Sequence, residues 1–201
     1  MDAALRAGIA LYDDGHHHAA HDAWEPTWLE LERGSDDERF LHGLIQFTAV
    51  VYHARNRNWS GATKLARSAG EYLAGLPDEF RGVNVAAVRR WLAVFAADPE
   101  RVERHRPLSL THEGEPLSLT GLDFESTAVA AEVLAEELGY DEAVVADAVG
   151  YAREELDTAE SRFLALVFDF VGDERRALVY DRLRRHVERR RQRDSDVEGL
   201  F

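Results

Sequence analysis

The sequence contains no cysteine, which excludes disulfides, thiolate metal sites and cysteine nucleophiles. Lysine is almost absent as well, since Lys64 stands alone beside 23 arginines. No apolar run approaches the roughly 20 residues of a membrane-spanning helix, so we expect no membrane partner. The first residues, Met1–Arg6, do not form a basic segment followed by an apolar one. We therefore expect no secretory signal and a cytoplasmic protein.

What the sequence does contain is acidic and apolar. Among 201 residues, 24 basic and 38 acidic side chains give a net charge of −14, and 45% of the residues are hydrophobic. This apolar content is enough to bury a core. The net negative charge argues against a general nucleic-acid binder, because Lys and Arg supply the affinity for phosphate. An acidic, arginine-rich and lysine-poor chain suits a salty cytoplasm and suggests halophilic adaptation.

Apolar residues recur at helical spacing along almost the whole chain, and this predicts an all-α, multihelical bundle. Ser35, Ser60 and Asn84 are expected N-caps, Gly15 is an expected C-cap, and Ser35 and Glu38 have the spacing of a capping box. The expected helices span residues 2–14, 16–33, 35–55, 60–76, 84–97, 126–138, 141–171 and 173–192, with a bend or split possible at Gly150.

Between Pro107 and Leu122 the apolar period changes to two, which predicts one short β-hairpin with strands at 108–111 and 117–120. An isolated two-stranded ribbon is marginally stable, so we expect it to lie on helices or to pair with another chain. We place the domain boundary before this hairpin. An N-terminal helical domain then spans residues 1–106, and residues 107–201 hold the hairpin and a C-terminal helical extension packed on that domain.

Two helices are predicted to carry polar stripes that face each other. A short loop at Gly34–Ser35 makes the second and third helices antiparallel neighbours, so their stripes are expected to form a shared pocket. The stripe of the second helix consists of His17, His21, Trp24, Glu25 and Trp28. The stripe of the third helix consists of Arg39, His42, Gln46 and His53.

Three interpretations of this seam stay open. In the first interpretation the seam is a closed hydrogen-bond network, since buried polar groups must be satisfied. Alternatively, it holds a divalent metal such as Zn, Mn or Fe, with His21 and Glu25 projecting together at i, i+4 and His53 or His17 as the third ligand. In the third interpretation it is a small-molecule pocket in which His21 and Glu25 act as acid and base.

The last predicted helix is basic. Residues 174–193 hold nine arginines against three acidic residues, Glu174, Asp181 and Glu188, a net charge of +6. We expect these arginines to pair with the acidic remainder of the chain or of a second subunit. A homo-oligomer is therefore left open as a partner, and nucleic acid is not expected.

The seam residues also resemble a known family. His21, Glu25 and Trp28 form an HxxxExxW motif, and Arg39–Gln46 and Asn58–Ala62 follow in matching order. Over about residues 1–76 the chain resembles the domain-of-unknown-function 309 family, and its second half resembles extensions of salt-loving archaeal members. The resemblance implies a small helical domain and suggests metal binding by the motif. Its signature positions fall on His21, Glu25, Trp28, Arg39, Gly43, Gln46, His53, Asn58, Gly61 and Ala62.

Two functions follow from these observations. The favoured one is a non-catalytic interaction or scaffold module built on the buried polar network. The other is a divalent-metal-binding protein, or a metal-dependent hydrolase in which His21 and Glu25 serve a metal-activated water. The sequence leaves open whether the protein is an enzyme.

Overall fold

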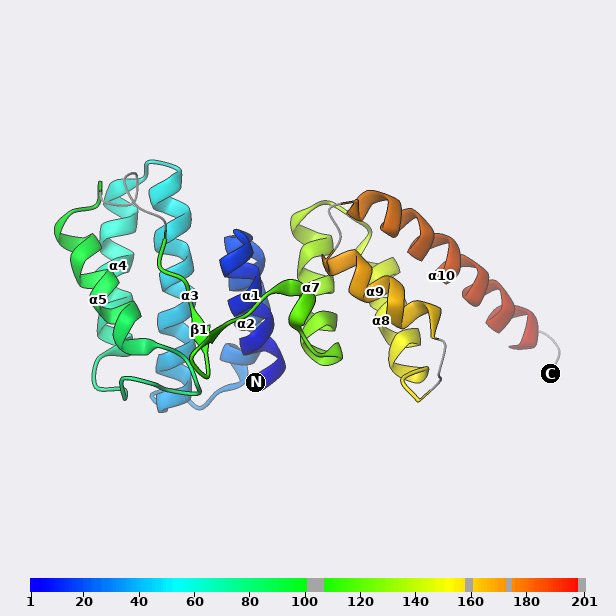
Figure 1. Ribbon diagram of the computed structural model, residues 1–201, viewed down its shortest axis with the longest axis horizontal. Coiled ribbons are helices and arrows are strands. Elements are labelled where there is room, and N and C mark those ends of the chain that lie inside the picture. The colour runs from blue at the N-terminus through cyan, green and yellow to red at the C-terminus, as the bar shows by residue number, and fades with distance from the viewer. Residues whose placement is uncertain (101–106, 158–160, 173–174, 199–201) are drawn as a thin grey trace. The chain divides into compact units, whose positions relative to one another are not determined.

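The computed structural model describes residues 1–100, 107–157, 161–172 and 175–198 (Figure 1). In these residues the chain forms nine α-helices and one two-stranded antiparallel hairpin, which confirms the predicted fold class. The fold divides into two compact units, residues 1–121 and residues 122–201. None of the described helices combines the length and the apolar character needed to cross a membrane.

The first unit is a row of five helices in which each helix packs on its neighbour in sequence (Figure 1). They are α1 (Asp2–Asp14), α2 (His17–Glu30), α3 (Asp36–Arg55), α4 (Trp59–Leu73) and α5 (Val85–Ala97). The long central helix α3 contacts both α2 and α4. The core between the helices contains Leu5, Ile9, Trp24, Phe40, Leu44, Phe47, Leu73, Leu92 and Phe95, all almost fully buried.

The helix ends test the predicted caps. The backbone amide of Glu38 donates to Ser35 Oγ at 3.1 Å, so α3 begins where the capping box predicted. The prediction that Ser60 caps α4 is wrong. Asn58 is the N-cap, because its Oδ1 accepts from the amide of Gly61 at 3.1 Å. Helix α2 ends at Glu30, three residues before the predicted end at residue 33.

The hairpin is shorter than predicted and its strands lie closer to the turn. It consists of β1 (Thr111–His112) and β2 (Glu115–Pro116), whereas Leu119–Gly121 forms the 3₁₀ helix η1 instead of a strand. Pro116 has no N–H to continue the ladder, so pairing stops there. The hairpin belongs to the first unit, because Glu113 N donates to Gly82 O at 2.7 Å. The division between the units therefore follows the hairpin, whereas the sequence analysis placed a boundary before it.

The segment before the hairpin is tied to α1. Tyr12 Oη donates to Leu108 O at 2.9 Å, and the Asp13 carboxylate accepts from Ser109 Oγ at 2.9 Å and from Leu110 N at 3.1 Å. Burial raises the pKa of Asp13, and these two hydrogen bonds offset only part of that effect. The end of α1 thus fixes the path of the chain that leads into the hairpin.

The second unit contains α7 (Phe124–Glu137), α8 (Glu142–Glu154), α9 (Arg162–Gly172) and α10 (Arg176–Glu198). The prediction of one helix over residues 141–171 is wrong. The chain breaks after Glu154 and not at Gly150, and Ser161 starts a new helix by accepting from Leu164 N at 3.0 Å. The predicted start of the last helix at residue 173 lies outside the described residues.

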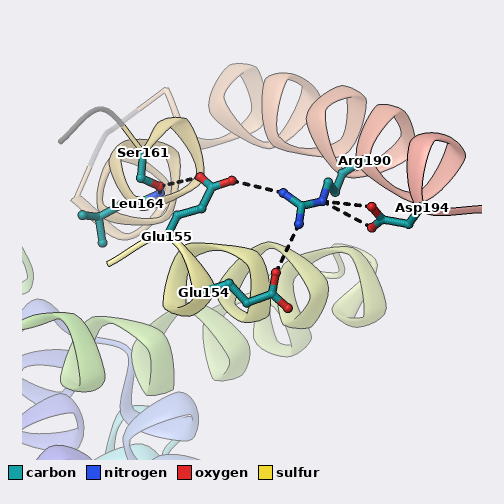
Figure 2. A network of polar contacts seen from close by, with 6 residues as sticks. All are labelled: Glu154, Glu155, Ser161, Leu164, Arg190 and Asp194. Atoms are coloured by element: carbon teal, nitrogen blue, oxygen red, sulfur yellow. Dashed lines mark hydrogen bonds and ion pairs between the residues drawn. The ribbon is translucent and has the colours of Figure 1, made fainter. Parts of the chain in front are cut away.

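Helix α10 is held by an apolar face and by ion pairs. Val179, Leu183 and Val187 are buried in the core of the unit. Figure 2 shows the guanidinium of Arg190 between Glu154 at the end of α8, Glu155 directly after it and Asp194 of its own helix, at N–O distances of 3.2–3.3 Å. These contacts confirm the expected pairing with acidic groups of the same chain for Arg190.

Candidate functional site

Two residues of the predicted α2 stripe face α1. Trp24 is fully buried, and its Nε1 donates to Leu5 O at 3.3 Å. The His17 ring is 6% exposed and stacks on Tyr12 with ring centroids 5.1 Å apart. His17 also lines a cavity of about 350 Å³ together with Arg55 and Ser109. Trp24 is therefore part of the core, whereas His17 borders a space at the end of α1.

A cluster of potential metal ligands lies on α2. One ligand atom each from His21, Asp22 and Glu25 lies within 4.8 Å of the others, and all three residues are half-buried. In the described part of the chain, this is the one group of histidine and acidic residues with such geometry. The helix brings these side chains together because residues at i, i+3 and i+4 share a face. We call these three residues the α2 cluster.

Hydrogen bonds fix the orientation of Asp22 in the α2 cluster. Its Oδ1 lies 2.9 Å from His21 Nδ1, and its Oδ2 lies 2.8 Å from Nδ1 of the exposed His18. The Asp22 hydrogen bond raises the pKa of His21, burial lowers it, and the negative charges of Asp22 and Glu25 raise it further, so the net shift is upward. Glu25 accepts no hydrogen bond from the described residues. The cluster thus already attracts a cation, the proton on His21.

His53, which was predicted as the third ligand of this site, contacts other groups instead. His53, in the last turn of α3, accepts from Asn58 Nδ2 at 3.1 Å and contacts the Tyr52 ring edge-on. It is not a member of the α2 cluster. Sequence reasoning missed Asp22, although its i, i+3 spacing to Glu25 was a signal that could have identified it.

The two helices of the predicted seam meet through Glu38, which sequence reasoning used only as a cap. Trp28 Nε1 donates to Glu38 Oε1 at 3.0 Å, and Gly34 N donates to Oε2 at 3.3 Å. His42 Nδ1 lies 3.6 Å from Oε1. The His42 ring contacts the rings of Trp28 and of Tyr72 of α4, at centroid distances of 4.4 Å and 4.0 Å. We call Trp28, Glu38 and His42 the α3 network.

Burial alone would raise the pKa of Glu38. Hydrogen bonds from Trp28 and Gly34, together with the nearby His42, outweigh burial and leave the pKa of Glu38 below its usual range. Glu38 is also in the first turn of α3, where the helix dipole favours a negative charge. The hydrogen bonds of the α3 network therefore stabilise the ionised form of the Glu38 carboxylate.

The remaining seam residues lie at the edges of this network. Gln46 Nε2 donates to His42 Nε2 at 3.1 Å, and Gln46 Oε1 is buried with no hydrogen-bond partner among the described residues. Arg39 points to α4, where it donates to the carbonyl of Ala74, and it also pairs with Asp36 at 3.5 Å. The stripe on α3 is thus divided between α2 and α4.

Comparison with known proteins supports the resemblance in part. A family model described as "Domain of unknown function (DUF309)" matches residues 5–65. The matched segment holds the α2 cluster, the α3 network and the Asn58 cap of α4. A search of curated proteins finds no match to the chain. The salt-adapted, archaeal character of the chain and the origin of its second half stay predictions.

Proposed function

We propose that the first unit binds a divalent metal ion through His21, Asp22 and Glu25. The observation that supports this proposal is the mutual distance of their ligand atoms, all within 4.8 Å. One imidazole nitrogen and two carboxylate oxygens form a donor set that suits Zn, Mn or Fe. His18, which contacts the second oxygen of Asp22, resembles the outer-shell partners that orient metal ligands.

Removal of one ligand is expected to weaken metal binding by at least the roughly 10- to 100-fold that loss of an outer-shell partner costs. Glu25→Gln keeps the size of the side chain and removes the charge. The matched control is Glu30→Gln, because Glu30 is exposed on the same helix and outside the α2 cluster. Isothermal titration of untagged, metal-free protein with Zn²⁺ and Mn²⁺ should show about one equivalent bound by wild type and by Glu30→Gln. Equal affinity in both variants, or less than about a tenth of an equivalent in wild type, would overturn the proposal.

Metal affinity is expected to fall with decreasing pH. A metal must displace the proton from His21, whose pKa is raised above its ordinary value of 6.5 by Asp22 and Glu25. The affinity should therefore begin to decline at a pH above 6.5 and then fall by up to about tenfold per pH unit. Titrations between pH 5.5 and 8.5, with the His21 ring followed by NMR, measure both quantities. A constant affinity over this range would contradict a histidine ligand with a raised pKa.

We infer that the α3 network has a structural role, which supports a non-catalytic module as the second candidate function. Arg39, His42 and Glu38 are all engaged with protein groups, including a backbone carbonyl and the Trp28 indole. A side chain used in this way is not positioned to bind a substrate. The interaction surface of such a module then has to lie elsewhere on the chain.

A further inference from the structure

The arginines of α10 divide between two faces of the helix. On the side next to α8, Arg190 binds three carboxylates (Figure 2). The Arg190 guanidinium also lies 5.0 Å from the centroid of the Tyr151 ring. Arg191 pairs with Asp147, and Arg184 pairs with Glu188 on its own helix. These arginines neutralise acidic groups of the second unit and help to hold α10 in place.

Four other arginines lie on the solvent face. They recur at i, i+3, i+7 and i+11, which places them within about 80° of one another on the helix and along about 16 Å of its axis. All four are exposed. We call them the arginine stripe: Arg182, Arg185, Arg189 and Arg193.

No carboxylate among the described residues forms an ion pair with the arginine stripe. Four acidic side chains of α10, in the part whose side chains the structure describes, are engaged elsewhere. Asp181 and Glu188 contact Arg184, Asp194 binds Arg190, and Asp196 accepts from Gln192. The arginine stripe is thus a run of four cationic groups on α10 for which the described residues supply no carboxylate partner.

Two members of the stripe are already oriented by the backbone. Arg185 Nε donates to Asp181 O at 3.0 Å, and Arg189 Nε donates to Arg185 O at 3.1 Å. Both bonds use Nε, and the two Nη groups of each guanidinium make no hydrogen bond to the described residues. A guanidinium held in this way loses less conformational entropy when it binds an oxyanion. Its planar set of N–H donors can also bind a phosphate through two parallel hydrogen bonds.

We propose that the arginine stripe binds the phosphate backbone of a nucleic acid. Successive residues of one strand rise about 3.4 Å along a duplex, so a stripe about 16 Å long can reach a separate phosphate with each arginine. The stripe lacks aromatic residues, and Leu178 is the exposed large apolar side chain beside it. The cores of protein–protein interfaces are mostly apolar, whereas nucleic-acid interfaces are polar and strongly positive. The sequence count of +6 did not favour this partner because it could not separate paired from unpaired arginines.

The proposal predicts a defined salt dependence. Four phosphate contacts release about 0.9 counterion each on duplex DNA, so log affinity should fall with log salt with a slope of about −3.6. Between 50 and 200 mM NaCl this slope corresponds to about a 150-fold loss of affinity. Fluorescence anisotropy of the full-length protein with a labelled 20-base-pair duplex measures the slope.

A matched pair of charge variants tests where the binding occurs. Changing all four stripe arginines to glutamine should abolish duplex binding and its salt slope. The control changes four exposed cations of the first unit to glutamine, with the same loss of charge, and should keep the slope: Arg33, Lys64, Arg67 and Arg90. A stripe variant with four lysines should keep most of the slope, and circular dichroism confirms that each variant remains helical.

Three results would overturn the proposal. One is the absence of duplex binding by wild type at 25 mM NaCl. Another is an unchanged slope in the glutamine stripe variant. The third is a self-association of wild type at low salt, seen by sedimentation velocity without DNA, that the stripe variant loses. That last result would assign the stripe to a second copy of this acidic chain.

Discussion

Replacing Gly8 with alanine is expected to destabilise the first unit by about 3 kcal/mol. A Cβ atom at Gly8 would lie 2.1 Å from Trp24 Nε1 and 2.2 Å from Trp24 Cε2. The indole cannot move away easily, because it is fully buried and bonded to Leu5 O. Alanine gains only about 1 kcal/mol over glycine in a helix, so the steric conflict determines the sign.

The matched control is the same substitution at Gly70. Gly70 lies inside α4, and nothing lies within 4 Å of a Cβ built there. Gly70→Ala should therefore stabilise the unit by about 0.5–1 kcal/mol through helix propensity. Urea unfolding followed by tryptophan fluorescence reports on this unit alone, because all four tryptophans lie in residues 1–121. A stabilising effect at both glycines would show that Trp24 is free to shift.

A double-mutant cycle can isolate the contact. In a Trp24→Leu background the alanine at position 8 meets a smaller side chain, so its cost should shrink by at least about 1 kcal/mol. Trp24→Leu is itself destabilising because it leaves a cavity in the core. An unchanged cost of Gly8→Ala in that background would mean that the strain arises elsewhere in α1.

The features that the sequence predicted correctly depend on local signals. Gly15 ends α1 with a left-handed φ of 99°, and Ser35 caps α3, because both roles involve only residues a few positions away. The closeness of Gly8 and Trp24 has no such signal, since α1 and α2 must pack before the contact exists. The same holds for Arg39, which is drawn to the end of α4 by a carbonyl 35 residues away in sequence.

In the candidate site too, the residues with a signal inside one helix were predicted correctly, and the contact between helices was not. His21 and Glu25 were identified from the i, i+4 spacing within a single helix, and they lie together. The choice of His53 depended on a helical projection, which gives the direction of a side chain but not its neighbours. In the second unit the apolar period runs through residues 141–171 without a gap, so the cap at Ser161 was overlooked. The apolar pattern likewise could not identify the partners of the α10 arginines, because these carboxylates are distant in sequence.

Removing the carboxylate of Glu38 is expected to cost about 2–3 kcal/mol at pH 7. Glu38→Ala leaves the Trp28 indole N–H and the Gly34 amide without their acceptor, and it removes a negative charge from the first turn of α3. Glu38→Gln retains one oxygen as acceptor, so its cost should be about half as large. Asp36→Asn, in the same turn but exposed, controls for the helix dipole and should cost less than about 1 kcal/mol.

The cost of Glu38→Gln should depend on pH. Because the pKa of Glu38 in the folded protein is below its ordinary value of 4.5, the ionised carboxylate contributes stability above pH 4.5, and this contribution is lost as pH falls through the lowered pKa. The glutamine variant has no such titration. The difference in unfolding free energy between the two proteins should therefore be largest at neutral pH and shrink below pH 4.5. If their urea midpoints decrease in parallel from pH 7 to pH 3, Glu38 does not stabilise the fold as an ion, and the α3 network depends on its neutral hydrogen bonds.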